Sequence, residues 1–110
     1  MPPIGLTLRF LAEFGRGIWL ASPLLLCLAI IIALLGQIVG RQEGWRPFES
    51  IYWAFVTGTT VGYGDMRPTR KSSRIIAIIV ALTGLTFTGI LIALAVFAAS
   101  AALQTYGVQG

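Results

Sequence analysis

The sequence has no histidine and a single cysteine, Cys27, among its 110 residues. Without histidine there is no histidine-based catalytic triad and no histidine metal ligand, and one thiol forms neither a disulfide framework nor a zinc site. Charged residues are also scarce, at 11%, whereas 56% of the residues are hydrophobic and the mean hydropathy is +0.85. This composition excludes a disordered chain, disfavours an enzyme and indicates a membrane protein.

The net charge of +4 comes from eight basic and four acidic residues. So few basic side chains in so apolar a chain do not indicate nucleic-acid binding. No stretch carries arginine at every third position, so we do not expect a voltage sensor.

Two long runs contain no charged residue. Ile18–Val39 covers 22 residues, which as a helix measure roughly 33 Å and can cross a hydrocarbon core about 30 Å thick. Ile75–Leu103 covers 29 residues, so as a helix it must tilt, bend or protrude from the bilayer. The first run is longer than the hydrophobic region of a signal peptide, so we expect a retained span. Buried helices of a soluble protein are the alternative, but 110 residues are too few to surround two such helices.

Residues 1–17 precede the first span and have an amphipathic pattern. Leu8 and Leu11 fall near one helical face, whereas Arg9 and Glu13 fall on another and form an i,i+4 pair. The pattern predicts a short helix at the membrane interface, with a frayed basic terminus as the alternative.

The segment between the spans is too long for a tight hairpin and is not uniformly polar. Pro47 suits the first position of a helix, and an aromatic-rich stretch follows it to residue 59. A helix over 47–59 is only about 18–20 Å long, too short to cross a bilayer, so we expect it to be re-entrant and to return through non-helical backbone at 60–65. Non-helical backbone at membrane depth is tolerated only where protein surrounds it or where it lines a water-filled path. The segment therefore predicts a pore.

The residues of this return path carry a resemblance. The run Thr57-Gly58-Thr59-Thr60-Val61-Gly62-Tyr63-Gly64-Asp65 resembles the selectivity filter of potassium channels, and Tyr52-Trp53-Ala54-Phe55-Val56-Thr57 is similar to the pore helices of prokaryotic two-span channels. A chance Gly-Tyr-Gly turn in a surface hairpin is the alternative. The resemblance implies an all-α membrane protein with a pore domain at 18–103. Its expected parts are an outer helix 18–39, a re-entrant pore helix 47–59, a filter 60–64 and an inner helix 70–103, followed by a short tail 104–110.

The resemblance also implies a function: passive, potassium-selective conduction, with K⁺ as the transported ion and no cofactor. Stacked rings of backbone carbonyls from Thr60, Val61, Gly62 and Tyr63 would replace the water shell of K⁺, and the Thr60 hydroxyl would add the innermost ring. Such carbonyls share a direction only if the backbone alternates between conformations that L-residues dislike, which Gly62 and Gly64 adopt without a Cβ penalty. One chain supplies a quarter of each ring, so a homotetramer around a central pore is implied. A weakly selective cation channel and a non-conducting membrane interaction subunit are the alternatives.

Further residues acquire expected roles from the same resemblance. Those expected to support the filter are Trp53, Val56, Thr57 and Asp65. A hydrogen bond is expected between Asp65 and the Trp53 indole. The side chains of Val61 and Tyr63 are expected to pack against Trp53 and its neighbours. Those expected to line the cavity below the filter are Thr59, Thr88 and Ile92. Gly84 is the expected gating hinge, with close helix packing as the alternative.

The resemblance also places Arg67 at the outer mouth, where some relatives carry an aromatic residue. A separate pattern is interpreted from the sequence itself. Gly36 and Gly40 form a GxxxG pattern that we interpret as the end of a helix.

The orientation signals conflict. Six of the eight Lys and Arg residues lie between the spans, which by the positive-inside rule favours a cytoplasmic middle segment. The resemblance instead implies a multi-pass protein of the cell (inner) membrane, with the filter outside and both termini in the cytoplasm. Arg70, Lys71 and Arg74 begin the inner helix, where cations oppose the helix dipole, and anionic lipid could compensate them. A solvated basic rim is the alternative. The sequence is compatible with a small channel or with the pore of a longer, ligand-gated chain.

Overall fold

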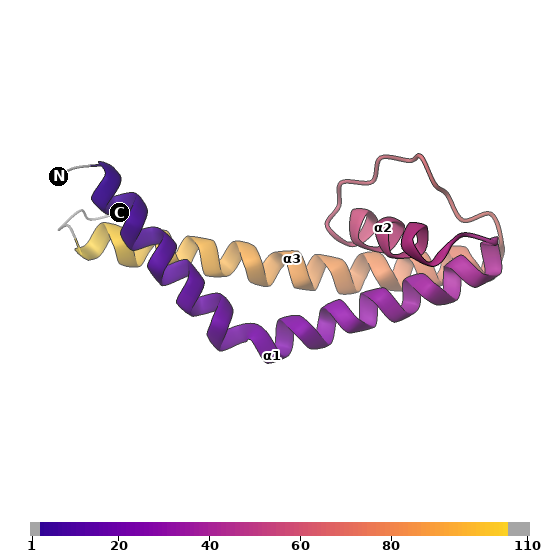
Figure 1. The fold of residues 1–110 in the computed structure, drawn as a ribbon, viewed down its shortest axis with the longest axis horizontal. Helices are drawn as coiled ribbons and strands as arrows, with labels where there is room; N and C mark the ends of the chain where they lie inside the picture. The colour runs from indigo at the N-terminus through magenta and orange to yellow at the C-terminus, as the bar shows by residue number, and fades with distance from the viewer. Residues whose placement is uncertain (1–2, 106–110) are drawn as a thin grey trace. The chain divides into compact units, whose positions relative to one another are not determined.

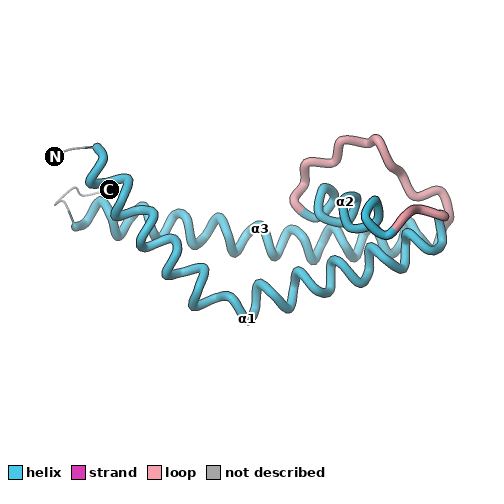
Figure 2. Tube along the Cα trace, in the orientation of Figure 1, coloured by secondary structure: helices cyan, strands magenta, loops and turns pink. Residues whose placement is uncertain are grey.

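The computed structural model of the chain describes residues 3–105, which form three helices and no strand (Figures 1 and 2). Helix α1 spans Pro3–Glu43, α2 spans Pro47–Gly58 and α3 spans Lys71–Thr105. By length and composition, both α1 and α3 can cross a membrane. The expected all-α fold, with a short helix between two long apolar ones, is confirmed.

The long helices extend beyond the expected bounds. α1 begins at Pro3, so residues 3–17 continue into the first span without a break, and an ion pair of 3.2 Å between Arg9 and Glu13 supports this part of the helix. Its place at the membrane interface stays a prediction. Of the expected tail 104–110, Gln104 and Thr105 belong to α3, and 106–110 lie outside the described residues.

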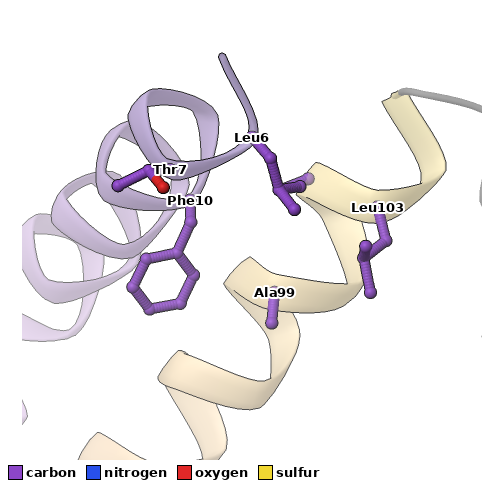
Figure 3. A pocket seen from close by; sticks show the side chains of 6 residues that line it. Leu6, Thr7, Phe10, Ala99 and Leu103 are labelled. Atoms are coloured by element: carbon purple, nitrogen blue, oxygen red, sulfur yellow. The ribbon is translucent and has the colours of Figure 1, made fainter. Parts of the chain in front are cut away.

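The chain folds into two compact units, each built from parts of α1 and α3. The first unit contains the part of α1 before Leu24 and the part of α3 after Thr88. Within it, the two helices approach closely at Gly17, where an added Cβ would lie 3.1 Å from Leu94 Cδ2. An apolar pocket of about 280 Å³ in this unit is lined by Leu6, Thr7, Phe10, Ala99, Ala102 and Leu103. Figure 3 shows this pocket from close by.

The second unit, Leu24–Thr88, contains all of α2 and the loop that follows it. Its core consists of buried side chains from all three helices: Ile32, Val39, Trp53, Ala54 and Val80. Pro47 opens α2 as expected, because its missing N–H would be unsatisfied at that position anyway. The core fixes α2 against α1 and α3.

The contact between α1 and α2 corrects our interpretation of the GxxxG pattern. Gly36 and Gly40 are both buried inside α1, which ends only at Glu43. A Cβ on Gly36 would lie 2.6 Å from the Cβ of Ala54, and a Cβ on Gly40 would overlap the Ser50 hydroxyl. The two glycines therefore let the pore helix pack directly on the outer helix, as small residues do in membranes.

The contact between α2 and α3 depends on a second pair of glycines. A Cβ on Gly84 would overlap the backbone of Gly58, the last residue of α2. Backbone cannot move aside as the end of a flexible side chain can. The structure thus supports a packing reason for Gly84, and its expected role as a gating hinge stays a prediction.

A third contact, which the sequence analysis did not predict, is a set of hydrogen bonds that joins the end of α1 to the start of α3. One carboxylate oxygen of Glu43 accepts bonds from the Thr69 N–H (2.9 Å) and hydroxyl (2.8 Å), and the other accepts the Arg70 N–H at 3.0 Å. Gln42 accepts bonds from Ser72 and Ser73 beside it. The side chains of α1 thus satisfy donors at the start of α3, where a negative charge also complements the helix dipole.

This contact changes the acidity of Glu43, which lies beyond the uncharged run 18–39. The N–H of Arg70 is the main cause, and with the bonds from Thr69 it outweighs partial desolvation and lowers the pKa of Glu43 from 4.5 to about 2.

We predict that Gly84→Ala destabilises the protein by about 1–3 kcal/mol per chain, the usual cost of overpacking. Gly89→Ala is the matched control, because an added Cβ at Gly89 meets none of the described residues within 4 Å. Thermal unfolding in detergent micelles measures both variants. If Gly84→Ala has the same melting temperature as the wild type, the contact with Gly58 does not constrain the helices.

We also predict a pH-dependent contribution from Glu43. Because its pKa is lowered on folding, its bonds stabilise the fold fully above about pH 4.5, and this stability is lost as the pH falls toward 2. Glu43→Gln should therefore lower the melting temperature at pH 7 and reduce its further fall between about pH 5 and pH 3. Glu49→Gln is the control, because among the described residues Glu49 accepts one long bond, 3.4 Å from the Arg46 N–H. An unaltered pH profile in Glu43→Gln would exclude this contribution.

Candidate functional site

The backbone leaves the helical path just after Gly58. The N–H of Thr59 donates to the Phe55 carbonyl at 2.9 Å, and the N–H of Thr60 donates to the Thr57 carbonyl at 3.1 Å. The Thr59 hydroxyl donates to the same Phe55 carbonyl at 2.6 Å. These bonds satisfy the last turn of α2 and direct the following residues into an extended return path.

The return path has an alternating backbone. Thr60, Gly62 and Gly64 have φ values of +67°, +55° and +79°. The left-handed conformations expected at the two glycines are confirmed, and Thr60 extends the alternation by one step. A β-branched residue rarely adopts positive φ, and such strain costs of order 1–3 kcal/mol and is typical of functional sites. Gly62 and Gly64 are two positions apart, and extending this spacing back by two positions predicts a positive φ at Thr60.

Two hydrogen bonds hold this backbone in place. The N–H of Gly62 donates to the Val56 carbonyl at 3.1 Å, so Val56 supports the return path through its backbone. The Thr60 hydroxyl donates to the Thr59 carbonyl at 2.5 Å. Because its hydrogen is used in that bond, the hydroxyl oxygen keeps its lone pairs for a cation.

The partner of Asp65 differs from the expected one. Its carboxylate accepts a bond from the Tyr52 hydroxyl at 3.1 Å, not from the Trp53 indole. Tyr52 and Val56 are four residues apart and share the face of α2 toward the return path, whereas Trp53 is turned about 100° away. Partial desolvation, together with Asp65, raises the pKa of Tyr52 and keeps its hydroxyl a donor. Because residues four apart lie on the same helical face, the position of Val56 would have predicted Tyr52 as the partner of Asp65.

Trp53 instead belongs to the core of the second unit. It is 5% exposed, and its ring centroid lies 5.4 Å from that of Trp45. Tyr63 is 71% exposed and Val61 52% exposed, although Trp53 and Tyr63 line the same cavity of about 240 Å³ behind the return path. Within one chain, Val61 and Tyr63 therefore remain largely exposed and do not pack fully against Trp53 and its neighbours as expected.

The other expected site residues lie in different places. Thr57 contributes its carbonyl to Thr60, and the Thr88 hydroxyl donates weakly to the Gly58 carbonyl at 3.5 Å. Ile92 belongs to the first unit and is 59% exposed. Within residues 3–105, no group of three or more His, Cys, Asp or Glu could hold a metal ion. The oxygen donors of the site are backbone carbonyls and the Thr60 hydroxyl.

The basic residues after the return path are exposed. Arg74 donates from Nε to the Pro68 carbonyl at 3.2 Å, and Arg67 donates from Nε to the Gly64 carbonyl at 3.3 Å. The ion pair of Arg9 with Glu13 is the only one in the described part of the chain. The cluster Arg70, Lys71 and Arg74 therefore has no carboxylate in salt-bridge contact there.

Several known proteins are similar to this chain in amino-acid sequence. The chain is 41% identical over 69 residues to "TWiK family of potassium channels protein 7" of Caenorhabditis elegans, covering 60% of this chain and 12% of that protein. It is 47% identical over 45 residues to a voltage-gated potassium channel of Aeropyrum pernix, covering 41% of this chain and 15% of that one. It is 36% identical over 91 residues to the human voltage-gated potassium channel regulatory subunit KCNG2, covering 74% of this chain and 18% of that one.

The chain thus spans less than a fifth of the length of these curated relatives. No solved structure matches it significantly. The sequence pattern of the ion channel family, however, matches residues 23–100, which include the second half of α1, all of α2, the alternating backbone and most of α3. The chain belongs to the ion channel family.

Proposed function

We propose that this chain forms a homotetrameric pore that conducts K⁺ selectively and passively across the membrane. The observation that carries the proposal is the alternating backbone at Thr60, Gly62 and Gly64. Alternation of this kind lets successive carbonyls face one path, where oxygen rings replace the water shell of a cation. The potassium channel names of the relatives support K⁺ as the ion.

The geometry of one chain supports assembly into a tetramer. A single return path supplies one oxygen at each level, whereas a dehydrated K⁺ needs several around it. Exposure of Tyr63 and Val61 also favours assembly, because these apolar groups beside a functional backbone lack packing partners within the chain. Four copies about one axis would both complete the rings and cover these side chains.

We further propose a multi-pass protein of the cell (inner) membrane, with the return path outside and both termini in the cytoplasm. The cluster Arg70, Lys71 and Arg74 would then lie at the outer interface. Among the described residues, no side chain of this cluster forms an ion pair with a carboxylate, and this supports contact with anionic lipid headgroups.

Two other functions are compatible with parts of the molecule. A non-conducting interaction subunit is favoured by the name of one relative, a regulatory subunit. A weakly selective cation channel is disfavoured by Tyr63, since relatives of that kind usually lose the filter tyrosine. Conduction and selectivity, measured together, separate the three functions.

We predict that the purified chain in liposomes takes up rubidium, that excess external K⁺ competes with this uptake and that excess Na⁺ does not. Native mass spectrometry should give about four times the chain mass of 11.8 kDa. A tetramer that conducts nothing would support the interaction subunit, and equal competition by Na⁺ would support the weakly selective channel.

We predict that Tyr63→Asp raises Na⁺ permeability, because a charged, smaller side chain cannot pack behind the ring formed by its own carbonyl. Tyr63→Phe is the matched control, since it keeps the ring size and the backbone conformation. Reversal potentials under opposed K⁺ and Na⁺ gradients measure the change. An unaltered reversal potential in Tyr63→Asp would contradict the role of this residue in selectivity.

A further inference from the structure

Arg67 contacts the return path at the residue that ends the alternation. Its Nε donates to the Gly64 carbonyl at 3.3 Å. Gly64 has a φ of +79°, and a Cβ added there would lie 3.6 Å from the Arg67 terminal nitrogen. The planar guanidinium thus lies against the backbone of Gly64, on a carbonyl that would otherwise be free to face an approaching cation.

Arg67 forms no ion pair with a carboxylate among the described residues. Asp65 is the nearest carboxylate in the sequence, but it accepts its bond from Tyr52, and no ion pair joins it to Arg67. The other acids of the second unit are engaged elsewhere, with Glu43 at the start of α3 and Glu49 at the start of α2. Arg67 is therefore a fixed positive charge beside the last carbonyl of the path.

We propose that Arg67 controls how fast cations reach the filter from its own side, and so makes conduction directional at low salt. The proposal rests on the tetrameric K⁺ pore proposed above. Four guanidinium groups, each held on a Gly64 carbonyl, form a ring of positive charge around one entrance. This ring lowers the local K⁺ concentration there and leaves the opposite entrance unaffected. Current that starts on the Arg67 side is therefore the smaller of the two.

The effect depends on screening by salt. The Debye length is about 10 Å at 0.1 M and about 3 Å at 1 M. At about 20 mM K⁺ the ring acts over the whole entrance, whereas at about 1 M its field reaches little beyond the guanidinium groups. A directional difference caused by Arg67 must therefore shrink as symmetric K⁺ is raised.

Single-channel recording in symmetric K⁺ tests the proposal, because the two current directions of one channel serve as internal controls. For the wild type we expect the two currents to differ by about twofold at about 20 mM K⁺ and by less than about 1.2-fold at about 1 M. Arg67→Gln should remove the low-salt difference by raising the smaller current. Arg67→Lys should keep most of the difference, because it retains the charge.

A control variant and the outcomes complete the test. Arg41→Gln removes the same charge from the last turn of α1, outside the return path, and should change the ratio of currents much less than Arg67→Gln. A low-salt ratio in Arg67→Gln equal to that of the wild type overturns the proposal, as does a lysine variant that behaves like glutamine. A wild type that conducts no K⁺ overturns the proposed function as well, so the two failures are distinguishable.

Discussion

Backbone carbonyls of successive residues can face one path only if alternate residues adopt left-handed φ, which L-side chains resist. In this chain the alternation comprises Thr60, Gly62 and Gly64. It is held from behind by the pore helix, through the bond from Gly62 to the Val56 carbonyl. The position of α2 therefore determines whether the return path keeps a conformation that its own residues would not choose.

The rest of the second unit fixes α2. On one side, Gly36 and Gly40 place no α1 side chain between the two helices, so that Ala54 and Ser50 of α2 pack on the α1 backbone, and on the other Gly58 meets Gly84 backbone to backbone. Glycine has two separate uses here: left-handed φ in the return path and absent volume at the helix contacts. Glu43, the last residue of α1, is hydrogen-bonded to Thr69 and Arg70 just before α3, and so fixes the end of the loop that follows α2.

Much of this arrangement could be predicted from the sequence, because long uncharged runs, a proline start and a glycine-rich return path are local signals. What could not be predicted depended on the phase of a helix or on contacts distant in the sequence. Tyr52 and Trp53 are adjacent and both aromatic, and only the rotation of α2 decides which of them meets Asp65. The bonds of Glu43 join residues 26 and 27 positions apart. The sequence pattern places Gly36 and Gly40 at a helix end, because only the packing of α1 on α2 reveals their contacts with Ala54 and Ser50.

The alternation itself can be tested at Gly62, where an added Cβ meets nothing within 4 Å and φ is +55°. An effect of L-alanine there therefore comes from backbone conformation and not from lack of space among the described residues. Semi-synthesis allows Gly62→D-Ala to be compared with Gly62→L-Ala, since the D-residue favours positive φ. K⁺ flux through reconstituted channels is the measurement. The account predicts flux near that of the wild type for D-alanine and its loss for L-alanine, and equal flux through both would contradict it.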